Sequence, residues 1–444
     1  MIKKPAAKAA PVAAPEETTK KKIKTPQVIR GMRDILPEDE PYWRHAYETA
    51  QRVADAYGFS RIETPIVEPE ELFVRSVGKA SDIVEKEMYS FQDSDGDKIC
   101  LRPEVTASLC RAYIANGMFA KPQPQKLWVW GPMFRHDRPQ AGRYRQFYQA
   151  DFEIIGNASP IVDAQVILLT WTFFKELGIN AEIRINSIGS PEDRTRYKME
   201  LVQWYRTRKK ELCENCLKRL VKNPLRLLDC KEAGCRALRA DAPQILDWLS
   251  APSKAHFMAV LEYLDELEIP YFLDPFIVRG LDYYTHTVFE FVANDADDSK
   301  AQIALCGGGR YDLLVEQLGG KPTAACGVAP GIDRAVLAMK AQNVVPPAQP
   351  KPQIFVAQLG EQGRRRAIAL YEKLRQAGFV LTEAFSKESL KTQLDSANEK
   401  GVPFVLLVGQ REVMDNTVII RDMESGNQEV VDYHKIVSEM KKKV

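Results

Sequence analysis

Apolar positions recur at helical spacing where the globular part of the chain begins, and they change to strand-like runs further along. The first helical set ends near Gly58 and consists of Trp43, Ala46, Tyr47, Ala50, Val53, Ala54 and Tyr57. Strand-like runs are predicted at residues 59–73, broken by Pro65, and at residues 127–134, 146–156, 272–292 and 302–306. Glycine-rich turns and short helices at residues 311–318 and 332–339 follow. Because these strands do not alternate regularly with helices, the pattern favours an α+β fold with an antiparallel sheet.

The rest of the chain divides into an insertion, a linker and a smaller domain. Residues from about 190 to about 270 are helical and highly charged, which indicates an inserted module. Residues 345–352 are rich in proline, as linkers often are. Strands and helices then alternate closely, which predicts a small α/β domain. The predicted parts are a tail at 1–26, a main domain at 27–340, a linker at 341–352 and a second domain at 353–444.

Composition and charge narrow the class of protein. The 444 residues are 45% hydrophobic and 27% charged, values typical of a soluble globular chain. No run approaches the ~18 apolar residues that span a bilayer, so we expect no membrane partner. The first 25 residues hold seven lysines and two glutamates, a net charge of +5. Because the whole chain has a net charge of +2, the remaining residues carry −3. This Lys/Ala/Pro tail cannot bury a core and is expected to be disordered, with an arm that attracts tRNA or a membrane as the alternative. Nucleic-acid contacts of the remainder must come from local patches.

Eight cysteines are spread along a chain that shows no signal-peptide pattern, so we expect a cytoplasmic protein with reduced thiols. Cys213 and Cys216 form a Cys-x₂-Cys pair, and Cys230 and Cys235 follow it. This arrangement fits a structural four-thiolate zinc site, and free thiols are the alternative. The other four cysteines are interpreted as small core residues: Cys100, Cys110, Cys306 and Cys326.

The stretch from residue 134 to residue 153 carries the densest set of chemically useful side chains. It places four arginines on or beside a turn between two strands: Arg135, Arg138, Arg143 and Arg145. On the second strand, Gln149, Asp151 and Glu153 alternate with apolar residues, so one face offers acceptors near guanidinium donors. Arginine suits bidentate contacts with phosphate and carboxylate groups, although a solvated hairpin face would also explain this pattern.

Three further segments complete a recognisable set. Residues 278–284 read Val-Arg-Gly-Leu-Asp-Tyr-Tyr, residues 306–312 read Cys-Gly-Gly-Gly-Arg-Tyr-Asp, and a Gly-Ile-Asp-Arg run ends at Arg334. Together with the Phe-Arg-His-Asp-Arg-Pro-Gln run, they resemble histidyl-tRNA synthetase, a class II aminoacyl-tRNA synthetase, from about residue 27 to the C-terminus. The run from Phe134, which continues as Gly-Arg-Tyr-Arg-Gln-Phe to Phe147, resembles motif 2, the run ending at Arg334 resembles motif 3, and the segment around Pro65 resembles motif 1. The other two resemble the histidine-specific signatures.

The resemblance implies both architecture and activity. It implies a six-stranded antiparallel catalytic core, a homodimer joined partly through motif 1, a helical insertion and a C-terminal anticodon-binding domain. The implied activity is the ATP-dependent attachment of L-histidine to its cognate tRNA through a histidyl-adenylate. His286 and Pro330 depart from the residues usual at their positions, which bears on strand geometry and on the ATP site.

For ATP, the resemblance implicates four arginines and one aromatic ring. Arg135 matches the arginine on the α-phosphate, and Arg279 matches one on the opposite side, where other class II enzymes place a metal ion. Arg143 and Arg334 match arginines at the γ-phosphate and adenine, and Phe147 would stack on adenine. Magnesium would be bound mainly through the phosphates, since it retains waters and seldom uses an all-protein site.

For histidine and tRNA, the resemblance implicates polar side chains of these segments and of residues 104–106. Glu153 and Tyr284 match positions that take the imidazole ring, and Tyr311 closes the pocket. The amino group and nearby atoms are assigned to Glu104, Thr106 and Gln149, although Glu104 could simply be an acid in the first turn of a helix. Arg138 and Gln140 resemble residues that read the tRNA acceptor end, with a solvated polar loop as the alternative. None of these residues lies in the insertion, so we expect the active site not to depend on it.

Two other interpretations are weighed against this one. Paralogues that regulate histidine biosynthesis bind histidine without charging tRNA, but they lack the C-terminal domain and lose signature residues that this chain keeps. A plain nucleic-acid-binding module would need many Lys and Arg contacts with phosphates. Residues 353–444 hold 14 Lys plus Arg against 13 Asp plus Glu, which argues against broad nucleic-acid binding.

Overall fold

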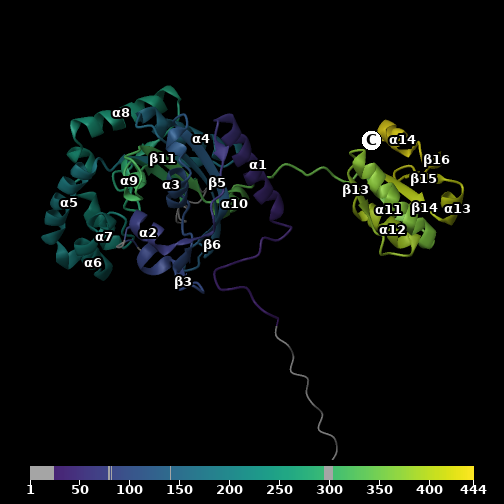
Figure 1. The fold of residues 1–444 in the computed structure, drawn as a ribbon, viewed down its shortest axis with the longest axis horizontal. Helices are drawn as coiled ribbons and strands as arrows, with labels where there is room; N and C mark the ends of the chain where they lie inside the picture. Colours follow the sequence, from purple (N-terminus) through teal and green to yellow (C-terminus); the bar gives the residue numbers. More distant parts are fainter. Residues whose placement is uncertain (1–24, 79–80, 82, 141, 295–303) are drawn as a thin grey trace, which may run out of the picture. The chain divides into compact units, whose positions relative to one another are not determined.

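The computed structural model describes residues 25–78, 81, 83–140, 142–294 and 304–444. The chain forms two compact units that divide between Pro346 and Pro347. The strands of each unit form sheets of their own (Figure 1). Each unit also has its own apolar core. Nearly all of the predicted tail, residues 1–24, lies outside the described residues. A search of the described helices finds none with the length and apolar character needed to cross a bilayer.

The first unit is built on an eight-stranded sheet with the order β1-β5-β6-β11-β10-β9-β7-β8. The strands are β1 (Ser60–Arg61), β5 (Gln125–Phe134), β6 (Gln146–Ile155), β7 (Ala181–Ser187), β8 (Phe272–Leu273), β9 (Thr285–Ala293), β10 (Ala304–Arg310) and β11 (Ala325–Pro330). The six strands from β5 to β7 pair antiparallel, whereas the short edge strands β1 and β8 pair parallel. The predicted α+β fold with an antiparallel sheet is therefore confirmed.

Apolar clusters cover the two faces of this sheet, because side chains alternate along each strand. On one face, Ala150, Phe152 and Ile154 of β6 pack against four helices. These helices are α1 (Glu40–Ala56), α4 (Pro160–Glu176), α8 (Ala251–Glu266) and α10 (Ile332–Ala341). The other face of β6 carries Gln149, Asp151 and Glu153 and is approached by α3 (Thr106–Ala115) and α9 (Leu314–Gln317). On this second face, polar strand residues lie beside helices that cover only part of the sheet, so the face can line a site.

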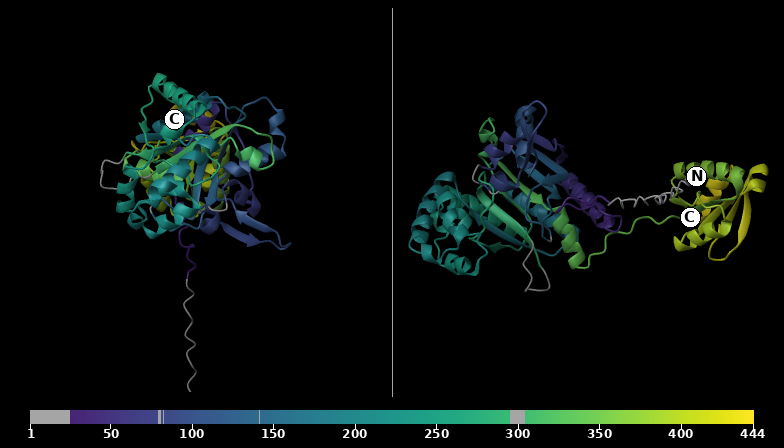
Figure 2. Two further views of the ribbon diagram at one scale, coloured as in Figure 1. Left: turned by 90° about the vertical axis from the view of Figure 1, so that its left-hand side faces the viewer. Right: turned by 90° about the horizontal axis from the view of Figure 1, so that it is seen from below.

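The predicted insertion contains two different parts. The helices α5 (Pro191–Arg206), α6 (Glu214–Lys222) and α7 (Ala233–Ala240) gather at one end of the first unit (Figure 1, Figure 2). Tyr197, Leu201 and Tyr205 are buried in the same apolar cluster as α3, so this module shares a core with its host. In contrast, α8 buries its apolar face in the main cluster beside α4. The sequence placed α8 inside the charged module because its exposed face is polar.

The segment predicted as one broken strand over residues 59–73 is mostly not a strand. It holds β1, the short strand β2 (Val67–Pro69) and the start of helix α2 (Glu70–Ser76). Proline residues interrupt the strand pairing, and Glu70 and Glu71 occupy the first helical turn, where negative charge is favourable. β2 pairs with β4 (Lys98–Leu101), and β4 pairs with β3 (Tyr89–Gln92), in a separate three-stranded sheet.

The strand predicted over residues 272–292 is divided by a loop. Residues 274–284 separate β8 from β9, and this loop carries Arg279. Near the start of β9, His286 has a left-handed φ of 47° where the register with β10 shifts. Its backbone N–H donates to Gly189 O at 2.9 Å, which holds the bulge in place. Pro330 is the last residue of β11, immediately before the turn into α10.

The glycine run predicted as a turn lies inside β10 instead. Gly307, Gly308 and Gly309 pair with both β9 and β11. A Cβ on Gly308 would lie 2.6 Å from Gly327 O and 2.5 Å from the Phe289 ring. Glycine is therefore required because neighbouring strands and side chains approach this backbone closely.

The second unit is a small α/β domain with a five-stranded sheet in the order β13-β12-β14-β15-β16. Its strands are β12 (Ile354–Gln358), β13 (Leu381–Glu383), β14 (Phe404–Val408), β15 (Thr417–Asp422) and β16 (Gln428–Asp432). Helices α11 (Gly360–Gln376) and α14 (Ile436–Lys443) pack into one apolar cluster, and α12 (Leu390–Glu399) into another. Between α12 and β15, the structure also has the short helix α13 (Gln410–Met414).

Candidate active site

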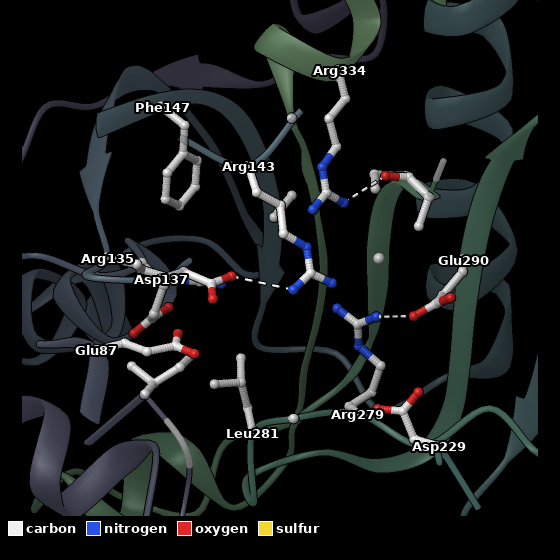
Figure 3. A pocket seen from close by; sticks show the side chains of 18 of the residues that line it. Glu87, Arg135, Asp137, Arg143, Phe147, Asp229, Arg279, Leu281, Glu290 and Arg334 are labelled. Carbon is white, nitrogen blue, oxygen red and sulfur yellow. Dashed lines mark hydrogen bonds and ion pairs between the residues drawn. The ribbon is translucent and has the colours of Figure 1, made fainter. Parts of the chain in front are cut away.

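A cavity of about 680 Å³ opens on the polar face of the large sheet. Strands β6, β9 and β10 and the start of α10 supply part of its lining. The turn between β5 and β6, the loop at residues 274–284 and the insertion supply most of the rest. Figure 3 shows the part of this cavity where basic side chains meet.

Four arginines that are distant in the sequence converge at one end of the cavity, here called the arginine end: Arg135, Arg143, Arg279 and Arg334. In Figure 3 the guanidinium groups of Arg143, Arg279 and Arg334 lie around a common space. Phe147 lies beside them, and its ring centroid is 5.3 Å from the Arg135 guanidinium carbon. The structure thus brings together all five residues that the sequence assigned to ATP.

Each of these arginines is held by an oxygen of the protein. Arg135 Nε donates to Pro103 O at 2.8 Å, and Arg334 Nη1 donates to Ala304 O at 2.6 Å. Arg143 pairs with Asp137 at 3.2 Å, and Arg279 pairs with Glu290 at 2.6 Å. The guanidinium positions are therefore set before any ligand arrives.

The arginine end concentrates positive charge. Burial lowers the pKa of Arg334, and the neighbouring guanidinium groups of Arg143 and Arg135 lower it further. Mutual repulsion of this kind is relieved by a bound anion. Guanidinium groups bind phosphate oxygens well, so this end of the cavity suits a polyphosphate.

The other end of the cavity, here called the acidic end, is lined by Glu104, Thr106, Gln149, Asp151 and Tyr284. Glu104 accepts from the backbone N–H of Ala107 at 3.2 Å, so it caps α3 and faces the cavity as well. Glu104 therefore lies just before the first turn of α3 rather than in it, and its assignment to the amino group stays a prediction. Tyr284 lies against Arg279, with 5.4 Å between its ring centroid and the guanidinium carbon, at the junction of the two ends.

Glu153 and Tyr311 lie behind the lining rather than in it. Glu153 accepts a hydrogen bond from Thr106 Oγ1 at 2.7 Å and another from Tyr311 OH at 2.6 Å. Gly327 packs so closely against the Glu153 carboxylate that any side chain there would displace it. Glu153 is thus fixed by two hydroxyl groups and one glycine.

Three buried carboxyl groups affect one another at the acidic end. Burial raises the pKa of Glu153 to about 8, although the hydroxyl groups of Tyr311 and Thr106 oppose the shift. Burial also raises the pKa of Glu104. The pKa of Asp151 is raised well above its usual value by burial and by the nearby Glu153 and Glu104. A bound cation would stabilise the ionised forms of these groups.

Arg138 and Gln140 occupy the exposed turn between β5 and β6. Gln140 lies at the cavity rim and forms an isolated bridge with Arg143. The backbone N–H of Arg138 donates to the Asp137 carboxylate at 2.6 Å. Their exposure beside the cavity leaves both the tRNA interpretation and the solvated-loop interpretation open.

The four cysteines of the insertion come together in space. The sulfur atoms of Cys213, Cys216, Cys230 and Cys235 all lie within 4.8 Å of one another. Cys213 Sγ and Cys230 Sγ are 3.9 Å apart, and tetrahedral zinc with ~2.3 Å bonds would separate its sulfurs by ~3.8 Å. Backbone N–H groups of Cys216 and Cys213 point to Sγ of Cys213 and Cys235, each at 3.4 Å. This donor set fits zinc. The remaining four cysteines are buried in the core, as predicted.

The insertion also forms part of the cavity wall, which contradicts the expectation that the active site is independent of it. Cys213 and Cys230 themselves line the cavity, as do Arg219 and Arg226. Arg219 Nη1 donates to Arg226 O at 3.3 Å, and Arg226 pairs with Asp229 at 3.2 Å. The sequence missed this wall because no local motif connects residues 213–232 with the distant strands.

Asp151 and Glu290 are further cavity residues that the sequence did not assign to a site. Asp151 could have been found, because it lies between Gln149 and Glu153 on the same face of one strand. Glu290 could not, since its significance comes from the ion pair with Arg279 across the loop.

Comparisons with known proteins agree with this geometry. The histidyl-tRNA synthetase family model matches residues 31–189 and 208–335, and the anticodon-binding domain model matches residues 353–443. A histidine–tRNA ligase of Dehalococcoides mccartyi is 44% identical over 94% of this chain and 100% of its own length. One from Pelotomaculum thermopropionicum is 42% identical over 94% of this chain and 97% of its own length. The crystal structure of apo S. aureus histidyl-tRNA synthetase has a TM-score of 0.78 at 34% identity, covering 94% of this chain and 99% of that one. The chain belongs to the histidyl-tRNA synthetase family.

Proposed function

We propose that this protein activates L-histidine with ATP and transfers the histidyl group to its cognate tRNA. The observation that carries the proposal is one cavity with two chemically opposite ends. Its arginine end suits a polyphosphate, and its acidic end suits a small molecule with a cationic group and nitrogen donors. Histidine and ATP placed in this way would meet at the junction beside Tyr284 and Arg279.

The proposed first reaction joins a histidine carboxylate oxygen to the α-phosphorus of ATP while the bond to pyrophosphate breaks. Arg135 and Arg279 would stabilise the charge at the α-phosphate from two sides, and Arg143 and Arg334 would hold the γ-phosphate and adenine. Phe147 would stack on adenine. These roles depend mainly on positioning and electrostatic stabilisation, which the preset arginines provide.

Histidine would bind at the acidic end. Glu153 and Tyr284 are proposed to recognise the ring, with Glu153 oriented by the hydroxyl groups of Thr106 and Tyr311. Glu104, Thr106 and Gln149 are proposed to hold the amino group and the atoms around it. A site with buried polar groups of this kind rejects ligands that leave them unpaired.

In the second reaction, a terminal ribose hydroxyl of the tRNA attacks the activated carbonyl and releases AMP. Arg138 and Gln140 would contact the acceptor end, because both are exposed on the turn between β5 and β6 and Gln140 lines the cavity. The second unit, which matches the anticodon-binding domain, would bind the other end of the tRNA.

The proposal includes two metal ions with different positions. Among the described residues, the four cysteines are the group of three or more potential ligands close enough to bind one ion. Magnesium would therefore be bound mainly by the ATP phosphates, where it neutralises charge. Zinc bound by the cysteines would stabilise the folded form of the inserted module. Elemental analysis should then find about one zinc per chain.

We further propose a homodimer and a cytoplasmic location. The dimer proposal is supported by exposed apolar side chains in the motif 1 region and the small sheet beside it, namely Ile66, Val67 and Phe91. The cytoplasmic proposal is supported by eight free thiols.

Histidine-dependent exchange of pyrophosphate into ATP tests the activation reaction directly. Replacing Arg279 with alanine should lower the exchange rate by about 10²–10³, because a preset charge at the transition state is lost. Arg375→Ala removes an exposed arginine of α11 in the second unit and serves as the control. Exchange by Arg279→Ala within tenfold of wild type, or exchange that does not require histidine, would contradict the proposal.

A further inference from the structure

An arginine of the insertion holds the backbone of the loop at residues 274–284. Arg194 Nη1, from the first turn of α5, donates to Tyr284 O at 2.7 Å and to Asp282 O at 3.4 Å. Both carbonyl groups precede β9, which begins at Thr285, so they lie outside its strand pairing. Backbone carbonyl groups away from water need donors, and here a side chain from another module supplies them.

The start of α5 is fixed firmly enough to position another segment. Asp193 is fully buried, forms a capping box with Ser190 and accepts the backbone N–H of Ser250 at 3.1 Å. The turn before α5 is bonded to β9, because the backbone N–H of His286 donates to Gly189 O at 2.9 Å. Arg194 therefore extends from a rigid helix end that lies beside the loop.

The same loop also contacts the end of α2. The backbone N–H of Asp282 donates to Val77 O at 3.4 Å. A Cβ on Gly78 would lie 2.5 Å from Asp282 Oδ2, so the loop packs closely against this glycine. Two separate elements thus hold the loop, α2 through its backbone and α5 through the Arg194 side chain.

The backbone that Arg194 holds carries two side chains of the cavity lining. Tyr283 and Tyr284 are 1% and 6% exposed, and their ring centroids are 4.9 Å apart. Tyr284 also lies against Arg279 at the junction of the two ends of the cavity. A shift of the Tyr284 backbone would move this ring, and misplacing a group in an active site by ~1 Å can cost about 10²-fold in rate.

We propose that Arg194 is a positioning residue for amino-acid binding, which fixes the Tyr284 backbone and thereby sets the Tyr284 ring at the junction of the cavity. Arg194 lies between the two segments that the family model matches, residues 31–189 and 208–335. Arginine keeps its charge when partly buried, and a charged donor binds a carbonyl oxygen more strongly than a neutral donor does. This inference rests on the proposed function, because it acts through a residue assigned there to histidine.

The test compares the affinities for L-histidine and for ATP, each measured alone by calorimetry. Arg194→Met should weaken histidine binding by about 10- to 100-fold, as expected for the loss of a hydrogen bond from a charged group. The ATP affinity should change little, because the other arginines of the cavity have separate anchors. Arg194→Lys should recover part of the loss, since it keeps a charged donor. Arg206→Met, at the exposed end of the same helix, is the matched control.

A contact that only joins the insertion to the rest of the first unit would lower the free energy of unfolding without changing the ratio of the two affinities. Equal weakening of both ligands, or wild-type histidine affinity in Arg194→Met, would therefore overturn the inference. If Arg194→Met does not fold, Arg194→Lys gives the answer. A larger loss for histidine than for ATP supports the inference, and wild-type affinities overturn it.

Hydrogen exchange tests the contact without a ligand. The amide groups of Asp282 and His286 donate within the held segment, so peptides covering residues 282–286 should exchange faster in Arg194→Met, with no change in β5 and β6. Unchanged exchange at residues 282–286 would refute the inference whatever the ligand is. If wild type binds another amino acid instead of histidine, the proposed function fails, and the exchange measurement and the same pair of titrations with that amino acid still test Arg194.

Discussion

Replacing Gly307 with alanine should inactivate the enzyme without altering any charged residue. Gly307 lies in β10, and its backbone conformation is one that alanine adopts readily. A Cβ at this position would overlap the guanidinium group of Arg279, with Nη1, Cζ and Nη2 as its nearest neighbours. To restore an ordinary contact of ~3.5 Å, the guanidinium group must withdraw by about 1 Å or more. The methyl group thus removes Arg279 from its position while leaving its charge in the protein.

The expected loss follows from this displacement. Misplacing a catalytic group by ~1 Å can cost about 10²-fold in rate, and losing such a charge contact costs about 10²–10³. Stability should change little, because the obstructed atoms are the end of a flexible side chain. Replacing glycine also lowers the entropy of the unfolded chain, which raises the free energy of unfolding by about 0.4–1 kcal/mol. By contrast, Gly308→Ala would meet the Gly327 carbonyl and should destabilise the fold.

A double-mutant cycle in the pyrophosphate-exchange assay tests this mechanism. If Gly307→Ala acts by displacing Arg279, the variant carrying both Gly307→Ala and Arg279→Ala should be no slower than Arg279→Ala alone. Gly234→Ala on α7, where a Cβ would meet nothing nearer than 4.0 Å, is the matched glycine control. Losses that multiply in the double variant, or Gly307→Ala activity near that of wild type, would refute the reasoning.

Three other measurements test separate parts of the structure. Deleting residues 347–444 should abolish tRNA charging but spare pyrophosphate exchange, since the first unit supplies the cavity lining, and equal losses would refute this separation. Chelating the metal or replacing Cys230 with serine should weaken both reactions, because Cys230 lines the cavity, and full activation by metal-free protein would contradict that role. The pKa of Glu153 is raised to about 8 in the folded protein, so folding retains a proton that the unfolded chain loses above pH ~4.5. The free energy of unfolding should therefore fall by up to about 1.4 kcal/mol per pH unit between those values, and Glu153→Gln should flatten that slope in denaturant titrations.

Periodicity predicted the elements whose side chains divide cleanly between core and solvent or cavity. The strands at β5 and β6 and the helix α1 were found in this way, as was the alternation of the second unit. Hydrophobic periodicity gave the wrong prediction at Gly307 to Gly309. Glycine has no side chain that could alternate between faces, so a run of glycines predicts a turn even where it lies in a strand. Periodicity also joined β8 to β9 across the loop that carries Arg279, since the intervening residues are apolar enough to resemble a strand.

The cavity lining was predicted where one segment carried several of the assigned residues. Arg135, Arg143 and Gln149 fall within a single hairpin, and the resemblance to a family added Arg279 and Arg334. The contribution of the insertion could not be predicted, because Cys230 and Arg226 reach the cavity only through the packing of α5 to α7 on the first unit.

The way each arginine is anchored explains how the cavity tolerates so much positive charge. Arg135 and Arg334 are bound to backbone carbonyl oxygens, and Arg143 and Arg279 to carboxylates of the cavity wall. The carbonyl contacts orient a guanidinium without neutralising it, whereas the carboxylate contacts reduce the repulsion between neighbours. An arriving polyphosphate can compete with Asp137 and Glu290, because both ion pairs are only partly buried. The arrangement therefore holds the arginines in place in the free enzyme while leaving their remaining donors available for the transition state.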